Sequence, residues 1–118
     1  MTKPIVDFTK FSRLVHEPAR LVILTALSEC ASADFTFLRR TIGLTPGNLN
    51  THLTALSNGG LVSIEKRIHG KGVQTLVSLT TAGRKAVKGH WRQLESLRKQ
   101  TTSRERFAIQ RPAPATAT

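Results

Sequence analysis

The sequence predicts an α+β fold, mainly helical with one small β-hairpin, within a single domain of 118 residues. Three observations lead to this prediction. Apolar residues recur three or four positions apart along most of the chain, as on one face of a helix. Around Gly70 and Gly72 this spacing changes to an alternating pattern rich in β-branched residues. Apolar residues make up 39% of the chain but aromatic residues only 5%, so Leu, Val, Ile and Ala must build the core.

The first predicted helix runs from Pro18 to Ser28. Pro18 suits the first turn of a helix, and the apolar residues that follow are dense enough to bury it on most sides. Before it, the apolar residues between Val6 and Val15 are spaced two to four positions apart, which fits either a short helix or an extended arm. We therefore assign residues 1–15 to an N-terminal arm or short helix and residues 16–80 to the folded domain.

Two short helices joined by a tight turn are predicted next. Thr36 can cap the first of them, and Gly43 ends it. Three of its apolar residues should face the core: Phe37, Leu38 and Ile42. Two basic residues should face solvent: Arg39 and Arg40. Thr45 is a good N-cap and Pro46 a good first residue, so the second helix should run to about Asn58. This arrangement is a helix-turn-helix.

A β-hairpin and a long helix complete the prediction. After Gly59 and Gly60, alternation places strands around Ile64 and over residues 73–79, joined by a basic tip that contains glycine. Thr80 or Thr81 caps the last helix, residues 81–100, and its apolar stripe is long enough to require a partner. The stripe consists of Ala82, Ala86, Val87, His90, Trp91, Leu94 and Leu97. Together these elements make a winged helix-turn-helix with an additional C-terminal helix.

The chain carries a strong excess of positive charge. Its 18 Lys and Arg residues outnumber its 7 Asp and Glu residues, which gives a net charge of +11 with the histidines neutral. A balance this basic predicts binding to nucleic acid or to another anionic surface. The C-terminal third holds most of the excess, including residues 101–118, which we expect to form a disordered basic tail.

The second helix of the helix-turn-helix has two contrasting faces. Leu49, Leu53 and Leu56 form a stripe that would pack on the preceding helix. The opposite face is small, polar and uncharged, which suits close approach to base edges because Asn pairs with adenine and Thr contacts thymine. Basic residues on either side would contact phosphates or the minor groove. The candidate DNA contacts are Arg39, Arg40, Thr45, Pro46, Gly47, Asn48, Asn50, Thr51, Thr54, Lys66, Arg67, His69 and Lys71.

The sequence lacks the signatures of several other classes of protein. Cys30 is the single cysteine, the four histidines are scattered, and the seven carboxylates form no evident catalytic pair. With no phosphate-binding loop or nucleophile motif either, we expect no enzymatic activity, no metal and no cofactor. No apolar run is long enough to span a bilayer and the N-terminus lacks a signal-peptide pattern, so we expect a cytoplasmic protein without a membrane partner.

The order of these motifs resembles winged-helix regulators of the MarR and ArsR type. The resemblance covers about residues 14–90, and it is closest to short MarR-like proteins. The segments that carry it are Pro18 to Leu24, Ala33 to Leu38, Asn48 to Leu53, Gly60 to Val62 and Leu79 to Gly83.

The resemblance implies a homodimer that reads a two-fold operator on double-stranded DNA, usually as a repressor. It implies that residues 45–54 form the major-groove helix and residues 66–73 the wing. The helix after Thr80 would form the dimer contact, through Ala86, Val87, His90, Trp91, Leu94 and Leu97. The paired cysteines and histidine-carboxylate clusters of ArsR-type metal sensors are absent, and the additional helices of full-length MarR proteins are missing, so an effector ligand stays an open question.

Two alternatives remain at this stage. Some winged helices hold a protein partner with the same helix, which would make this chain an interaction module. The basic C-terminal third would also suit an RNA-binding or nucleoid-coating protein with little preference for sequence.

Overall fold

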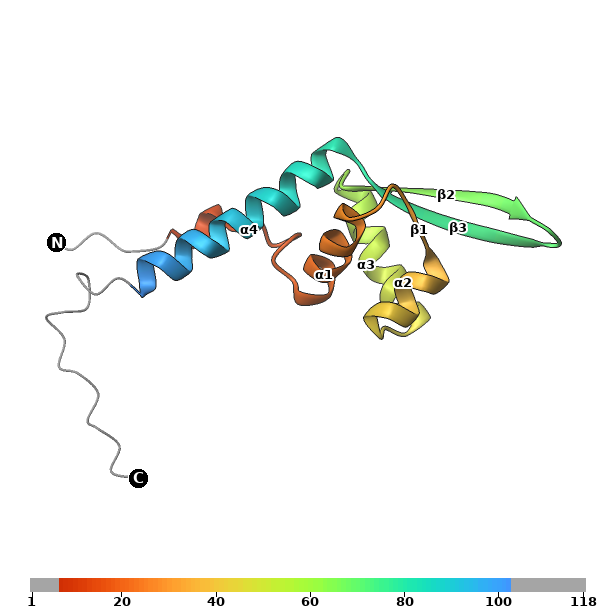
Figure 1. The fold of residues 1–118 in the computed structure, drawn as a ribbon, viewed down its shortest axis with the longest axis horizontal. Coiled ribbons are helices and arrows are strands. Elements are labelled where there is room, and N and C mark those ends of the chain that lie inside the picture. Colours follow the sequence, from red (N-terminus) through yellow and green to blue (C-terminus); the bar gives the residue numbers. More distant parts are fainter. Residues whose placement is uncertain (1–6, 103–118) are drawn as a thin grey trace, which may run out of the picture.

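The structure is a computed structural model that describes residues 7–102, and it has the predicted α+β architecture. Figure 1 shows α1, α2 and α3 gathered in one group, from which the hairpin β2–β3 extends to one side and α4 to the other. The remainder of the N-terminal arm and most of the predicted basic tail lie outside the described residues. The elements in chain order are a 3-10 helix (η1, Phe8–Lys10), α1 (Pro18–Ser28), β1 (Ala33–Asp34), α2 (Phe35–Ile42), α3 (Pro46–Asn58), β2 (Val62–His69), β3 (Gly72–Leu79) and α4 (Thr81–Thr101).

Helix α1 has the predicted bounds. Pro18 occupies its first turn, and the Glu17 side chain caps it by accepting a hydrogen bond from the Arg20 amide at 2.8 Å. Ile23, Leu24 and Leu27 are buried on the inner side of the helix. The chain before α1 forms the short η1 and then irregular structure that ends with Val15 buried in the core.

Helix α2 corrects two details of the prediction. Its N-cap is Asp34, whose carboxylate accepts from the Thr36 amide at 3.1 Å, so Thr36 lies inside the helix. The predicted inward position of Phe37 is also wrong, because its side chain is 60% exposed. The core-facing stripe uses the spacing Phe35, Leu38 and Ile42 instead, which places Phe37 about 100° away from Leu38.

The sheet has three antiparallel strands in the order β1-β3-β2. The hairpin pairs Val62 with Leu79 at its base and Ile68 with Val73 near its tip, and Gly70 adopts a φ of 62° in the turn. Strand β1 adds two residues to the outer edge of β3, with Ala33 opposite Val77. The sequence did not predict β1, because two residues are too few to show an alternating pattern.

Helix α4 is fixed at its N-terminal end by close contact with the chain between α3 and β2. The Thr80 amide donates to the Leu61 carbonyl at 3.1 Å, and the Thr80 hydroxyl donates to the Gly60 carbonyl at 2.7 Å. The same hydroxyl caps α4 by accepting from the Gly83 amide at 3.0 Å. A Cβ atom on Gly83 would collide with the Leu61 carbonyl oxygen, so only glycine fits there.

The N-terminal segment packs along α4. His16 Nδ1 lies 2.8 Å from His90 Nε2, and the ring of Phe11 meets the His90 ring edge-on with centroids 5.8 Å apart. The Gln93 side chain donates to the Lys10 carbonyl at 3.0 Å. The first half of α4 is therefore part of the same folded unit as α1, α2 and α3.

Candidate nucleic-acid interface

Helix α3 shows the two faces that the sequence predicts. Leu49, Leu53 and Leu56 are fully buried in the core. The residues on its outer side are all exposed: Gly47, Asn48, Asn50, Thr51 and Thr54. The face is uncharged along its whole length, so close approach of a polar ligand to it requires no buried charge.

The N-terminal turn of α3 is well defined by local hydrogen bonds. The Thr45 hydroxyl caps the helix by accepting from the Asn48 amide at 3.2 Å, and Pro46 is the first helical residue. The Thr51 hydroxyl donates to the Gly47 carbonyl at 3.0 Å. These hydrogen bonds fix the local backbone in the part of the helix where the predicted DNA contacts lie.

A contact between a carboxylate and a histidine joins the start of α1 to α3 on the border between the two faces of α3. His52 Nδ1 lies 3.7 Å from Glu17 Oε2, which also faces Arg20 at 3.7 Å. Burial by itself raises the pKa of Glu17. The amides of Arg20 and Ala19 and the neighbouring charges of His52 and Arg20 outweigh that effect, so the pKa lies below its ordinary value. Glu17 is therefore ionised at neutral pH and holds the start of α1 beside α3.

The turn between α2 and α3 brings two arginines next to the start of α3. Gly43 has a φ of 83°, and its amide and that of Leu44 both donate to the Arg39 carbonyl, at 2.9 and 3.1 Å. Arg39 and Arg40 occupy the last turn of α2, where Arg40 is exposed and Arg39 is half-buried. Both predicted phosphate contacts thus come from the segment that leads directly into α3.

The predicted cations of the wing lie on two different faces of the hairpin. Because successive residues of a strand point to opposite sides, Lys66 shares the face of Ile64 and Ile68, whereas Arg67 and His69 share the other. Lys71 lies in the turn. The Arg67 guanidinium donates to the Glu65 carboxylate at 3.1 and 3.3 Å, a pairing that the sequence analysis missed. The lysines of the wing therefore lie on one face and in its turn, whereas the reverse face carries the paired Arg67 and Glu65 together with His69.

Helix α4 corrects part of the predicted dimer contact. Val87 and His90 are covered by their own chain, with only 2% of His90 exposed, so they cannot line a contact with a second chain while this fold is kept. They face inward because α4 packs against α1 and the N-terminal segment, whereas Ala82 at the start of the predicted stripe is exposed. Ala86, Leu94 and Leu97 are half-buried, and Trp91 is 47% exposed. The Trp91 indole donates to the Thr25 hydroxyl at 2.9 Å.

Between α1 and α4 lies a groove of about 780 Å³ that includes the Trp91 side chain. Its walls combine this indole with several cations, among them Arg84, Lys88 and Arg92. The outward side of α4 is therefore basic next to Trp91.

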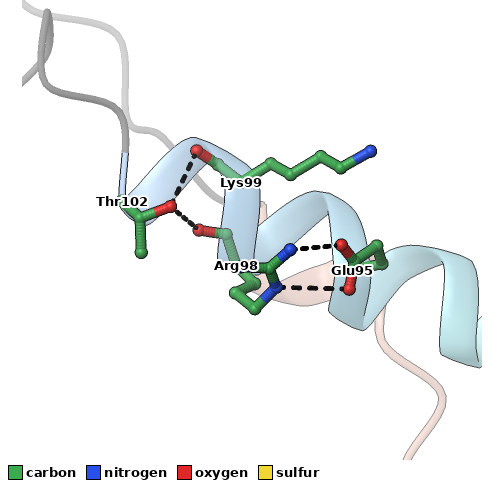
Figure 2. A network of polar contacts seen from close by, with 4 residues as sticks. All are labelled: Glu95, Arg98, Lys99 and Thr102. Atoms are coloured by element: carbon green, nitrogen blue, oxygen red, sulfur yellow. Dashed lines mark hydrogen bonds and ion pairs between the residues drawn. The ribbon is translucent and has the colours of Figure 1, made fainter.

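Figure 2 shows a polar network at the C-terminal end of α4. Arg98 donates twice to the Glu95 carboxylate, at 2.6 and 3.3 Å, and these hydrogen bonds lower the pKa of Glu95. The Thr102 hydroxyl donates to the Arg98 carbonyl at 2.8 Å and closes the last turn. Because the pair is exposed to solvent, it contributes little to stability, but it partly neutralises Arg98.

Within residues 7–102, no group of three or more His, Cys, Asp or Glu side chains is placed to hold a metal ion. In the same range, no helix is both long enough and apolar enough to cross a bilayer.

Comparison with known proteins agrees with this geometry. Residues 19–98 match the family described as winged helix DNA-binding domain. An uncharacterised protein of Methanocaldococcus jannaschii is 31% identical over 78 residues, which are 66% of this chain and 85% of the relative. The family match includes α2, α3 and the wing, the elements that carry the predicted DNA contacts.

Solved structures of transcription regulators share the fold. A transcriptional regulator homologue from Pyrococcus horikoshii OT3 superimposes with a TM-score of 0.74 at 29% identity, covering 78% of this chain and 91% of that one. The transcriptional repressor CouR, solved with a 23-mer DNA duplex, has a TM-score of 0.61 at 20% identity, covering 77% of this chain and 66% of that one. The resemblance to winged-helix regulators inferred from the sequence is thereby confirmed.

Proposed function

This chain belongs to the family of winged helix DNA-binding domains, and on that premise we propose that it is a sequence-specific transcription regulator. It is a DNA-binding protein rather than an enzyme. In the proposed mechanism a homodimer binds double-stranded DNA, acts as a repressor, and reads a two-fold site by inserting one copy of α3 into each of two major-groove segments.

The observation that carries the proposal is the exposed face of α3. Asn50 is well suited to a bidentate contact with adenine, and Thr51 and Thr54 are suited to hydroxyl or methyl contacts with neighbouring bases. Gly47 adds no side chain at the start of the helix, where its Cβ position has open space around it. A face without charge discriminates by hydrogen bonding and shape, so it would supply specificity more than affinity.

Affinity in this proposal comes from the cations on both sides of α3. Arg39 and Arg40 would contact phosphates at the start of the helix, and Lys66, His69 and Lys71 would contact the backbone or minor groove beyond its far side. Arg67 would exchange the Glu65 carboxylate for a phosphate, since an exposed ion pair of this kind costs little to break. Each such contact releases counterions, so binding should weaken steeply as salt rises.

We also propose that residues 81–100 form the dimerisation helix. Because Val87 and His90 are buried within the protomer, the contact would consist of the side chains that are only partly covered there. These are Ala86, Trp91, Leu94 and Leu97. Full burial of such side chains is favourable by about 25 cal/mol for each Å² of apolar surface. Arg84, Lys88 and Arg92 lie beside Trp91 and would border this contact.

The test compares wild-type protein with Asn50→Ala on duplexes that the wild type selects from a randomised pool. Asn50→Ala should lower affinity for the selected duplex about tenfold or more, because a bidentate contact to a base contributes ~1–3 kcal/mol. Affinity for unselected duplex should change little. Gln100→Ala, which truncates a comparable side-chain amide at the far end of α4, is the matched control and should leave both affinities unchanged.

Salt dependence completes the test. A plot of the logarithm of affinity against the logarithm of salt concentration should be linear and steep for wild type and Asn50→Ala alike. Equal affinity of the wild type for selected and unselected duplexes would favour general nucleic-acid binding instead. Affinity that ignores salt would argue against binding through phosphates.

A further inference from the structure

The tip of the wing exposes two large apolar side chains. Ile68 is 87% exposed and Val73 is 69% exposed, and the two residues lie directly opposite each other in the hairpin. In Figure 1 the tip of β2–β3 reaches well beyond the helices. Because the residues are cross-strand partners, their side chains share one face and form a continuous apolar patch.

This patch is not required by the fold. Along the same face of β2, burial falls from Val62, which is in the core, through Ile64, which is 39% exposed, to Ile68. Polar residues would complete the hairpin equally well beyond the core, and Lys66 and Thr75 already form one such cross-strand pair on this face. Single exposed apolar residues are common on protein surfaces, whereas a facing pair at the end of a projecting hairpin is typical of a contact surface.

The surroundings of the pair indicate what it contacts. Lys66 lies next to it on the same face, Lys71 lies in the turn, and Arg67 and His69 lie on the reverse face, all exposed. The acidic partner Glu65 lies on that reverse face, away from the patch. An apolar patch surrounded by cations is complementary to a surface that is anionic at its edges and apolar between them. The minor groove of DNA has phosphates on both sides, and a side chain that inserts between two base steps there meets the apolar faces of the bases.

We propose that Ile68 and Val73 form an apolar wedge that enters the minor groove beside the segment read by α3 and partly unstacks one base step. The inference rests on the proposed function, because it needs α3 in the adjacent major groove. The cations around the pair hold the hairpin between the two phosphate rows. The cost of unstacking is smallest at flexible pyrimidine–purine steps, so the wedge would give the chain a preference at positions that α3 never touches.

The test uses the full chain and the double variant Ile68→Thr, Val73→Thr. Threonine keeps the β-branched shape that a strand favours but removes apolar surface, and both positions are exposed, so the hairpin should fold as before. The probe is a duplex selected by the wild type, carrying the fluorescent base analogue 2-aminopurine at the flanking pyrimidine–purine step. Unstacking of that base raises its fluorescence. Lys71→Ala is the matched control, because it removes a charge from the same tip and no apolar surface.

The wedge predicts three results together. Wild type raises the 2-aminopurine fluorescence, whereas the double variant does not, and its affinity for this duplex falls by about tenfold as two apolar contacts are lost. The double variant keeps the wild-type salt dependence. Lys71→Ala keeps the fluorescence change but lowers the slope of log affinity against log salt by about one.

Several outcomes would overturn the wedge. If the double variant retains full affinity and fluorescence while Asn50→Ala still loses preference, the wedge is wrong and the proposed function stands. If the double substitution changes the sedimentation of the DNA-free protein, the patch is a contact between copies of the chain. If the wild type binds no duplex at all, both the wedge and the proposed function fail.

Discussion

Helices α3 and α4 each carry an apolar stripe, but one protomer covers the two stripes to different extents. The leucines of α3 are completely buried, so its remaining surface is polar and available to a ligand. In α4 the buried part ends at His90, and Leu94 and Leu97 beyond it are only half-covered. Within residues 7–102, the apolar stripe of α3 is completely covered, whereas Leu94 and Leu97 in the second half of α4 are only partly covered.

The two helices also differ in charge. The outer face of α3 has none, while α4 carries six basic residues and one acidic residue, Glu95. Two copies of so basic a helix would repel each other unless apolar surface lay between them. The contact that we propose therefore has to use the partly covered apolar residues and leave the cations outside.

The comparison predicts that the largest loss of stability follows from truncation in α3. Leu53→Ala should lower the free energy of unfolding by about 2–5 kcal/mol, because a buried leucine leaves a cavity. Denaturant unfolding followed by circular dichroism measures this. Thr54→Ala, its exposed neighbour, should change the value by less than about 0.5 kcal/mol. Similar losses for both variants would show that α3 is not packed as described.

A smaller loss should follow from crowding the start of α4. Gly83→Ala places a methyl group against the Leu61 carbonyl, and backbone cannot rotate away, so the expected loss is about 1–3 kcal/mol. Gly89→Ala is the control within the same helix, since nothing lies within 4 Å of its Cβ position. That variant should be neutral or stabilising by up to about 1 kcal/mol, because alanine favours helix. In thermal unfolding, the Tm of Gly83→Ala should lie below that of the wild type, and the Tm of Gly89→Ala should equal or exceed it.

The buried His90 should make stability depend on pH. Burial lowers the pKa of His90, and the adjacent His16 lowers it further. The unfolded chain then binds the proton more readily than the folded one, so stability is fully present above about pH 6.5 and falls as the pH drops below it. The charged groups around the pair are chiefly Arg13, Glu17, Arg20 and Lys85.

Unfolding measured at several pH values between about 7.5 and 5.5 tests this expectation. His90→Gln should reduce the loss on acidification, whereas His69→Gln on the exposed wing should leave it unchanged. An equal pH dependence in all three proteins would show that His90 is not the group responsible.

Most of the fold could be predicted from local signals in the sequence. Thr45, Pro46 and Gly43 mark the ends of α2 and α3 by their capping and conformational preferences, and the spacing of Leu49, Leu53 and Leu56 gives the buried side of α3. Strand β1 was missed because its pairing with β3 is set by tertiary contact. Hydrophobicity alone places Phe37 inward, whereas its angle to the buried Leu38 turns it toward solvent.

The candidate site was less predictable where it depends on how elements pack. A helical stripe shows which side of α4 is apolar, but not that α1 and the N-terminal segment bury Val87 and His90. The exposed pair Ile68 and Val73 looks from the sequence like any alternating strand. They are exposed because the core ends at Ile64, whereas the apolar residues at the base of the hairpin are buried. The sequence does not show where along the hairpin the core ends.

The smallest effect on protomer stability should come from charges on the second half of α4. Leu94→Glu with Leu97→Glu alters half-exposed positions, so unfolding of the isolated protomer should change by under about 1 kcal/mol. The same variant should halve the mass measured by sedimentation and weaken binding to a two-fold duplex, because buried carboxylates would face each other across the proposed contact. Ser96→Glu, on an exposed position between them, should keep the dimer. An unchanged mass in the double variant would show that the dimer contact does not include Leu94 and Leu97.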